Sequence, residues 1–588
     1  MTADGGPSPA LRGRGERPAT ALAAAERQRL DRFLGELAEG AQRWAQTSLT
    51  DRALLLRRVH DRVGTASNRW ARTAAGIKGL AAASSLVGEE WLSGPYAVLE
   101  TTKRLARTLD TLAQGRSPVE GLRFHDAPGG RTALEVFPLE TTERLLMSGY
   151  SVEVWFPPGV RPDDVAARAG LGARRTDGSG GVGLVLGAGN ITAIPPLDVL
   201  YELVAHNRAV VLKLNPVMAA MMTSYLDALD PLVSFGVLRV VQGGAEVGAY
   251  LAHHAGVRHV HITGSTASHD GVVFGPGPDG ERRRAEGRPL LQKPITSELG
   301  GVSPVLVVPG PWTEADLRFQ AEHVATQRLH NGGYNCIASQ VVLISPDWPL
   351  RERFLQHLRE AVDRAPVRPA WYPGSGSRTA SAAEHHPGAT RLGPEGDRLL
   401  VEVDARRPGP VATTEYFAPV LGVLEVPGTG QDFLDAAVRV ANDQLAGTLG
   451  VNVLVRPEDR RALGEGFDHA IAELRYGTIA VNTWTAVGFG TATAPWGAYP
   501  GGTVSDVGSG VGVVHNGLLL DGSERTVVHG PFRPFPRSLL AGERSLSPKP
   551  PWFVEARTAA ATGRLMADFA ARPSLRRLPG IAISAFRG

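Results

Sequence analysis

Cysteine is almost absent from this sequence, because Cys336 is the only one among 588 residues. A single cysteine cannot form an internal disulfide, so a disulfide-stapled secreted fold is excluded, and so is a cysteine-ligated zinc site. We therefore expect the reducing conditions of the cytoplasm. The scarcity also singles out the stretch HNGGYNCIASQ, in which the thiol lies between glycines and small residues.

Long apolar runs and a charge imbalance are absent as well. The N-terminal residues show no apolar segment of an export signal, and no run of about 18 apolar residues could span a membrane. The formal net charge is only +3, from 62 basic and 59 acidic side chains, without a block of like charges. Nucleic-acid binding is therefore not expected. We expect small molecules or further copies of the chain as partners.

Lysine is rare too. Of the 62 basic side chains only five are lysines, and one of them, Lys213, ends the predicted strand VVLKL. Because a generic surface cation in this chain is arginine, a lysine at a strand end indicates a specific role.

The pattern of apolar residues predicts an α/β fold with two parallel-sheet domains. From residue 181, short apolar runs such as GVGLVLGAGN and RAVVLKLNP alternate with helical segments, and a second series runs from about 336 to 485. Continuous apolar strands separated by helices are typical of parallel sheets covered on both faces. Segments 132–137 and 150–156 are rich in β-branched and aromatic residues and predict a two-stranded arm.

Helices are predicted at both ends of the chain. Leucines and Phe33 at helical spacing over 30–37 predict the first, and Ser48 is a candidate cap for a second that runs to Val63. A proline-rich tail precedes a predicted helix at 552–571, whose apolar face would comprise Trp552, Phe553, Leu565, Met566 and Phe569. We favour packing of this tail on its own subunit or a neighbour over contact with a membrane or a gate over a substrate site.

The run GSGGVG at 178–183 has the G-x-G-x-x-G spacing of dinucleotide-binding loops. In those loops the glycines follow a strand and open a helix, so that the pyrophosphate lies at the helix N-terminus. Here the glycines precede the predicted strand. We therefore interpret the run as a turn or linker.

The surroundings of Cys336 indicate a nucleophile. A free cysteine is most often buried and inert. Gly332 and Gly333, however, permit close approach to the backbone, and Ala338 and Ser339 place only small side chains near the thiol. A nucleophilic side chain needs such small surroundings if a substrate is to reach it.

A candidate general base lies in the segment SELGGVSP, residues 297–304. Glu298 precedes a diglycine and an apolar strand, where loops carry chemistry. The ordinary alternative is an exposed glutamate before a turn.

Six short motifs occur in one order: GAGN, KLNP, ITGS, ELGG, G-x-x-C and E-x-F-x-P. Over roughly residues 25–515 this order resembles the aldehyde dehydrogenase superfamily. The resemblance implies an aldehyde dehydrogenase-like α/β fold with NAD or NADP between two domains, and a small β oligomerisation arm that would support a homodimer or homotetramer. We accordingly expect a disordered leader at 1–20, a cofactor-binding domain at 21–295 with the arm near 132–156, a catalytic domain at 296–490, and a return segment with the C-terminal extension at 491–588.

The resemblance implies roles for three catalytic residues. Cys336 would attack an aldehyde to give a thiohemiacetal and then a thioester, and Glu298 would activate water to release the carboxylic acid. Asn190 of GAGN would donate to the developing oxyanion beside the Cys336 N–H. From its position alone, Asn190 could equally cap the helix predicted at 195–204.

It also implies five contacts to the cofactor. Lys213 would bind the adenosine ribose, Gly264 and Ser265 would meet the pyrophosphate, and Glu415 and Phe417 would hold the nicotinamide ribose and ring.

Four positions depart from the common pattern of that family. Pro216 replaces a glutamate that accepts from the adenosine 2′-hydroxyl, which leaves the choice of NAD or NADP open. His269 replaces a glycine after ITGS, and Tyr334 and Gln340 stand near the thiol in place of glutamine and arginine.

Two histidine pairs invite a metal interpretation. His259 and His261 share one face of the predicted strand VRHVHIT, and His253 and His254 are adjacent. Neither cysteine nor carboxylate completes either pair at metal spacing, so we interpret them as core or surface histidines and expect no metal site.

Three other functions stay open at this point. An acylating aldehyde dehydrogenase would pass the thioester to coenzyme A or return it to aldehyde, although a general base at Glu298 disfavours a strictly acylating enzyme. A noncatalytic scaffold would retain only the fold. A hydrolase would pair Cys336 with one of the 16 histidines, yet the sequence identifies no triad.

Overall fold

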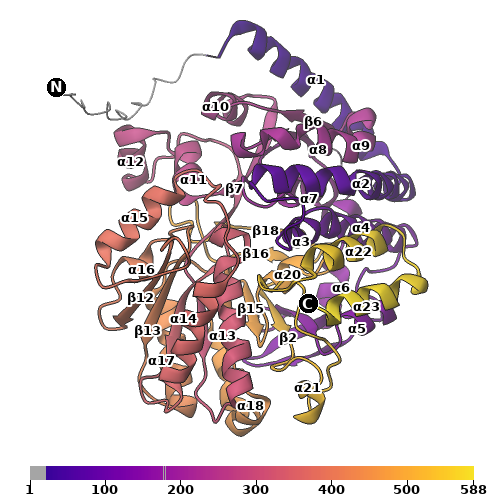
Figure 1. The fold of residues 1–588 in the computed structure, drawn as a ribbon. Helices are drawn as coiled ribbons and strands as arrows, with labels where there is room; N and C mark the ends of the chain where they lie inside the picture. The colour runs from indigo at the N-terminus through magenta and orange to yellow at the C-terminus, as the bar shows by residue number, and fades with distance from the viewer. Residues whose placement is uncertain (1–21, 176–177, 179) are drawn as a thin grey trace, which may run out of the picture.

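Two sheets organise the chain, which a computed structural model describes over residues 22–175, 178 and 180–588 (Figure 1). The smaller sheet has six strands in the order β17-β8-β7-β4-β5-β6. Five of them pair in parallel and β17 pairs antiparallel with β8. Their bounds are β4 Val182–Leu186, β5 Ala209–Lys213, β6 Leu238–Val241, β7 Val257–Gly264, β8 Ile295–Leu299 and β17 Gly510–Val511.

Helices cover this smaller sheet and join it in one apolar core. They are α1 Ala24–Gln46, α2 Leu49–Ile77, α7 Ile194–His206, α8 Met222–Ala228, α9 Asp230–Phe235 and α10 Ala245–His253. Ser48 caps α2 as predicted, because its hydroxyl accepts from the Asp51 N–H at 3.1 Å. The helix continues well past the predicted end at Val63, since buried alanines and Trp70 extend its apolar face.

The larger sheet has eleven strands in the order β1-β2-β3-β19-β15-β14-β9-β10-β13-β12-β11. Its six central strands, from β15 to β12, pair in parallel. They are β9 Ser303–Val307, β10 Ser339–Ile344, β12 Arg398–Asp404, β13 Val420–Glu425, β14 Gly450–Leu454 and β15 Thr478–Val481. The short strand β11, Thr390–Leu392, closes one end.

Both faces of these central strands are buried. Along β9, Val305 and Val307 pack into one apolar cluster, whereas Leu306 packs into a second. The covering helices are α13 Glu314–Leu329, α14 Arg351–Arg364, α17 Gly430–Gln444 and α19 Glu465–Glu473. The predicted α/β class with two parallel sheets is therefore confirmed.

The predicted arm pairs as expected and then joins the larger sheet. β2 (Arg131–Phe137) and β3 (Ser151–Phe156) are antiparallel, and β1 (Phe124–Ala127) extends them. β19 (Arg525–His529) pairs with β3 on one side and with β15 on the other. The arm thus continues the larger sheet of its own chain, and its role in assembly stays a prediction.

The tail packs on its own chain, as favoured from the sequence. Helix α22, Ala559–Ala571, contacts α3 (Val87–Trp91) and the adjoining turn, and lies beside α2 and α4 (Ala97–Ala113) in Figure 1. The predicted helix start at 552 is wrong: the Phe553 N–H bonds to Pro550 and the Ala556 N–H to Phe553, so this stretch forms successive turns. The helix does carry Leu565, Met566 and Phe569. It ends at Ala571 and is followed by α23, Leu578–Phe586.

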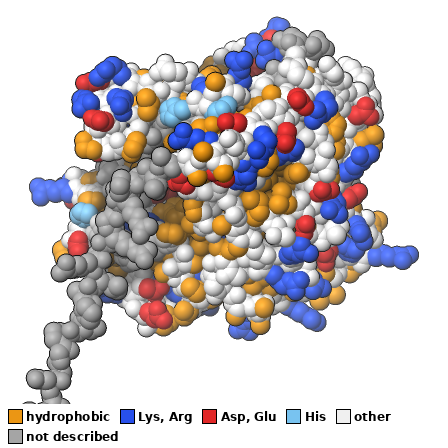
Figure 2. All heavy atoms as spheres, turned by 90° about the horizontal axis from the view of Figure 1, so that it is seen from above, with side chains coloured by type: hydrophobic (Ala, Val, Ile, Leu, Met, Phe, Trp, Pro, Cys, Tyr) orange, Lys and Arg blue, Asp and Glu red, His pale blue; other side chains and the backbone are white. Residues whose placement is uncertain are grey.

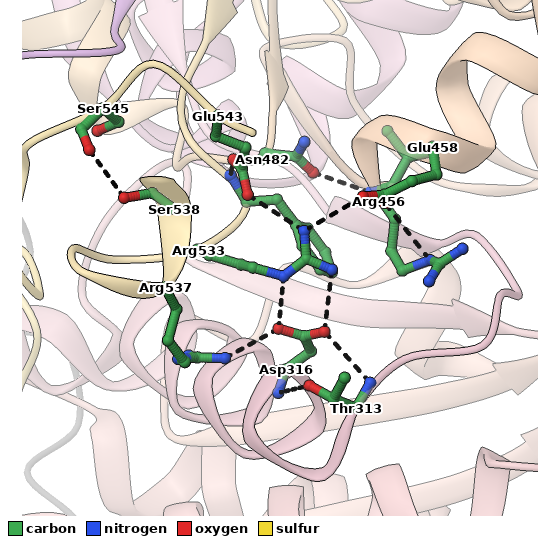
Figure 3. Close-up of polar contacts among 12 residues, drawn as sticks. Thr313, Asp316, Arg456, Glu458, Asn482, Arg533, Arg537, Ser538, Glu543 and Ser545 are labelled. Atoms are coloured by element: carbon green, nitrogen blue, oxygen red, sulfur yellow. Dashed lines mark hydrogen bonds and ion pairs between the residues drawn. The ribbon is translucent and has the colours of Figure 1, made fainter. Parts of the chain in front are cut away.

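A buried ionic cluster anchors the start of this tail (Figure 3). Asp316, near the start of α13, receives two hydrogen bonds from the Arg533 guanidinium, at 3.0 and 3.1 Å, and one from Arg537 at 2.9 Å. Arg533 also contacts Glu543 at 3.3 Å. The tail is therefore held by paired charges as well as by apolar contact.

Two sequence expectations concern residues that the structure does not describe. The leader predicted at 1–20 lies entirely outside the described residues, and so does Ser179 of the glycine-rich run. The strand β4 begins at Val182, so the first glycines of that run precede it as predicted. Within the described residues, the structure has no helix that is long and apolar enough to cross a membrane. Basic and acidic side chains are scattered together over the face shown in Figure 2.

Candidate active site

One cavity of about 680 Å³ collects every residue that the sequence singled out for catalysis or cofactor binding. Parallel strands place their carboxyl ends at one edge of a sheet, and the loops that leave this edge carry the side chains. The eight residues are Asn190 after β4, Lys213 at the end of β5, Gly264 and Ser265 at the end of β7, Glu298 on β8, Cys336 before β10, and Glu415 and Phe417 before β13.

Cys336 and Glu298 form the reactive pair of the cavity. Burial, the Glu298 charge and the hydrogen bond between the two side chains raise the pKa of the thiol well above its usual value. The raised pKa favours the thiol form of Cys336, so a base would have to accept its proton before the sulfur could act as a nucleophile.

Burial also dominates at Glu298, which is only 3 % exposed. It raises the pKa of this carboxyl to about 7, against the opposing effect of the hydrogen bond from Cys336. The Trp496 ring N–H donates to its Oε1 at 3.3 Å. A carboxyl group poised near neutrality can both accept and release a proton at physiological pH.

Asn190 is held against the loop that carries the thiol. Its side-chain N–H donates to the Tyr334 carbonyl at 2.9 Å, and the Asn331 amide donates to the Asn190 carbonyl at 3.2 Å. Asn331 has a φ of 56°, in the left-handed region, and Glu89 accepts from its backbone N–H at 2.9 Å. The loop before Cys336 is therefore fixed from two sides, with the second amide hydrogen of Asn190 left for a ligand.

The Glu415 carboxyl occupies space that a side chain at Gly300 would fill, because a Cβ there would overlap its oxygens. This contact explains the first glycine of ELGG. The Oε1 atom of Glu415 is buried without a hydrogen-bond partner, and burial raises the pKa of the group to about 8. An orphaned carboxyl oxygen in a cavity wall is suited to accept from a ribose hydroxyl.

The far end of the cavity suits the other half of a dinucleotide. Lys213 is buried at 8 % exposure, and burial lowers its pKa although Glu246 opposes the shift. Ser265 caps α11, Thr266–Val273, so the helix begins directly after the ITGS turn and the replacement at His269 does not displace its start. Pro216 lines this end of the cavity as well.

Tyr334 and Gln340, which depart from the family pattern, both support the loop of Glu415 and Phe417. Gln340 donates to the carbonyls of Val411 at 2.9 Å and Thr414 at 2.7 Å, and accepts from the Tyr416 N–H at 2.9 Å. The Tyr334 ring lies 5.9 Å from that of Phe417, and its hydroxyl bonds to Ser375 at 2.7 Å. The two replacements therefore build the nicotinamide end of the predicted site.

The histidines of β7 have carboxylate partners that the sequence did not reveal. His261 Nε2 lies 3.5 Å from Asp198, and His259 Nδ1 lies 3.2 Å from Glu202. Both acids stand on α7, one helical turn apart and about sixty residues upstream of the strand. Only the i, i+4 spacing of two acids in an otherwise apolar helix could have drawn attention to them.

Known proteins share this architecture. Residues 181–377 match the model of the aldehyde dehydrogenase family. The betaine aldehyde dehydrogenase structure from Staphylococcus aureus superposes with a TM-score of 0.57 at 15% identity, over 86% of this chain and 89% of that one. This protein has the aldehyde dehydrogenase fold. The NADP-dependent glyceraldehyde-3-phosphate dehydrogenase from Bacillus halodurans C-125 superposes similarly, with a TM-score of 0.56 at 18% identity over 86% and 92% of the chains.

Among curated proteins, a mitochondrial aldehyde dehydrogenase of Leishmania tarentolae is 25% identical over 270 residues. The match covers 42% of this chain and 48% of that protein, so it spans about half the length of the relative. The resemblance to the aldehyde dehydrogenase superfamily is thereby confirmed. Among the described residues, none of the C-terminal tail after β19 lines the cavity.

Proposed function

We propose that this protein oxidises an aldehyde to a carboxylic acid with NAD or NADP, through a thiohemiacetal and a thioester on Cys336. The observation that carries the proposal is the single cavity that holds the Cys336–Glu298 pair together with Asn190 and the five residues predicted for the cofactor.

The first half of the reaction begins at the thiol. Glu298 takes the Cys336 proton, and the sulfur adds to the aldehyde carbon. The negative charge on the former carbonyl oxygen is stabilised by the free amide hydrogen of Asn190 and by the Cys336 N–H, and one such donor is worth about 3 kcal/mol in a transition state.

The residues at the other end of the cavity fit a nicotinamide dinucleotide. Lys213 and Ser265 would hold its adenosine and pyrophosphate, Glu415 would accept from the nicotinamide ribose, and Phe417 would pack beside the ring. A bound nicotinamide would supply the hydride acceptor that oxidation of the thiohemiacetal carbon requires. Cys336 then carries a thioester.

The second half needs a base again. Glu298 accepts a proton from water as the water oxygen attacks the thioester carbonyl, the carbon–sulfur bond breaks, and the acid leaves. Transfer to coenzyme A would not require this buried carboxylate, so its position beside the thiol favours hydrolysis over acyl transfer.

The test is a panel of aldehydes assayed with NAD and NADP separately, with reduced nucleotide and acid both quantified. We expect equal amounts of the two products, and loss of both in Cys336→Ala. The control is Glu352→Gln, at a side chain that is 71% exposed and does not line the cavity. Undiminished turnover by Cys336→Ala would refute the mechanism, and acyl-CoA formation in the presence of coenzyme A would favour the acylating alternative.

A further inference from the structure

A stripe of polar side chains crosses the buried interior of the smaller sheet and begins at the active site. On β7, Thr263, His261 and His259 alternate along the strand and therefore share one face. On β8, Glu298 is the register partner of Thr263, and Thr296 is that of His261. Strands buried in parallel sheets are normally apolar, so a row of this kind calls for a reason.

The stripe is completed by the two acids of α7. We call Thr263, Asp198, His261, Thr296, His259 and Glu202 the histidine–carboxylate chain. The Thr263 hydroxyl, which lines the active-site cavity, donates to Asp198 at 3.0 Å and lies 3.2 Å from His261 Nε2. The chain therefore starts in the cavity wall, next to Glu298.

From His261 the contacts continue away from the cavity. His261 Nδ1 lies 2.9 Å from the Thr296 hydroxyl, which lies 3.5 Å from His259 Nε2. His259 Nδ1 lies 3.2 Å from Glu202, whose Oε2 accepts from Arg208 at 2.9 Å. Thr296 is half-buried and the Arg208 side chain is 20% exposed, so the chain meets solvent at two points.

The ionisable members are deeply buried. Asp198, Glu202, His259 and His261 are at most 4 % exposed. His515, from the loop after β18 (Val513–Val514), also faces Asp198 at 3.5 Å. Burying ion pairs generally contributes little to stability, because desolvation offsets their attraction. Proton movement is a function that would require such groups in series.

The proposed chemistry creates a need for it. Glu298 accepts the thiol proton in the first half-reaction and must accept a water proton in the second, while hydride transfer consumes none. The first proton must therefore leave Glu298 before deacylation, or the base is blocked. One proton is released for each aldehyde oxidised, which matches the overall stoichiometry.

We propose that the histidine–carboxylate chain is a proton relay between Glu298 and the surface. Glu298 gives its proton to the Thr263 hydroxyl oxygen, and the hydroxyl's own proton turns from Asp198 to His261 Nε2. His261 at the same time releases its Nδ1 proton to the Thr296 hydroxyl oxygen. The Thr296 hydroxyl passes its own proton to solvent or to His259, which hands one to Glu202. Burial opposes a charge on His261, but the charge and hydrogen bond of Asp198, together with the charges of Glu202 and Glu298, raise its pKa, so the ring is suited to accept a proton.

The relay rests on the proposed function, and Thr296→Val tests it. This variant keeps the shape of the side chain and every charge of the chain, but removes the hydroxyl that connects His261 to both exits. Thr296→Ser is the matched control, since it keeps the hydroxyl. The assay uses the full-length protein with an aldehyde that the wild type oxidises.

With Thr296→Val we expect a wild-type burst of reduced nucleotide in the first turnover, because the first half-reaction needs only an ionised Glu298. Steady-state turnover should fall about tenfold, which is a small effect for the loss of an acid–base step. The thioester on Cys336 should accumulate, and mass spectrometry of the quenched protein detects it. Thr296→Ser should behave as wild type. If Thr296→Val does not fold, His261→Gln makes the same interruption.

Wild-type turnover by Thr296→Val without thioester accumulation would overturn the relay alone. A wild-type protein that forms no reduced nucleotide with any aldehyde would contradict the proposed function and the relay together, so the two failures are distinguishable. A burst lost in Thr296→Val but kept in Thr296→Ser would also overturn the relay, since the lesion would then lie in the first half-reaction.

Discussion

Asp316 and Glu298 are both buried carboxylates, and their surroundings give them opposite properties. Asp316 lies between two arginines at the root of the tail (Figure 3), and although burial alone would raise its pKa, the hydrogen bonds and charge of Arg533 bring it below the usual value. Among the residues that the structure describes, no basic side chain forms an ion pair with Glu298, and burial raises its pKa to about 7. A carboxylate thus acts as a structural anchor where arginines neutralise it, and has the properties of the proposed base where they do not.

The largest expected effect separates the two sites by activity. Glu298→Gln keeps the size and the hydrogen-bonding capacity of the side chain but cannot accept a proton. We expect steady-state acid formation to fall by about 10²- to 10⁴-fold, because that is the usual contribution of a general base. Glu352→Gln, at a 71% exposed side chain, is the control that should leave turnover unchanged. Turnover within twofold of wild type would exclude Glu298 as the base.

Asp316→Asn tests the anchor. Removing one partner of a buried ion pair leaves uncompensated charge and generally costs about 3–5 kcal/mol. We expect a lower unfolding midpoint in denaturant and in thermal melts, and unchanged turnover for each folded molecule. An unaltered midpoint would mean that Glu543 and Glu458 compensate the charge of the arginines as well as Asp316 does.

The pH dependence of stability should differ in sign between the two carboxylates. The raised pKa of Glu298 gives a contribution that is present below about pH 4.5 and is lost as pH rises through about 7. Glu298→Gln should therefore become more stable than wild type at pH 8, by about 3 kcal/mol from the size of the shift, and match it in acid.

Asp316 should behave in the opposite way. Its lowered pKa gives a contribution that is present above the unfolded value and is lost as pH falls through the folded one. The stability deficit of Asp316→Asn should accordingly shrink on acidification. Denaturant titrations of both variants across this pH range measure the two trends, and parallel trends would contradict the comparison.

The smallest effect is expected at an exposed ion pair. Asp443 contacts Arg475, and the two side chains are 60% and 52% exposed. Exposed pairs of this kind contribute about 0–1 kcal/mol. Asp443→Asn should shift the unfolding midpoint far less than Asp316→Asn, and a loss of similar size in both would show that burial is not what distinguishes the anchor.

Much of the site could be predicted because its residues stand at the ends of strands. The apolar runs identified β4, β5, β7 and β9, and the order of short motifs indicated which loop residues meet. All eight predicted residues line one cavity. The start of α22 was predicted seven residues too early, since Trp552 and Phe553 are apolar but lie in turns.

Local pattern and chain order are enough to place the candidate side chains at strand ends. The candidates are one thiol, a carboxylate before a diglycine, and an asparagine after a buried strand. Only the tertiary structure decided the partners. His261 contacts Asp198 and Arg533 contacts Asp316, and in both cases the partners are distant in the chain. Among the described residues, Glu298 has no such ion pair. Since burial and neighbouring charge set the pKa of each group, the division between anchor and base arises only in the folded protein.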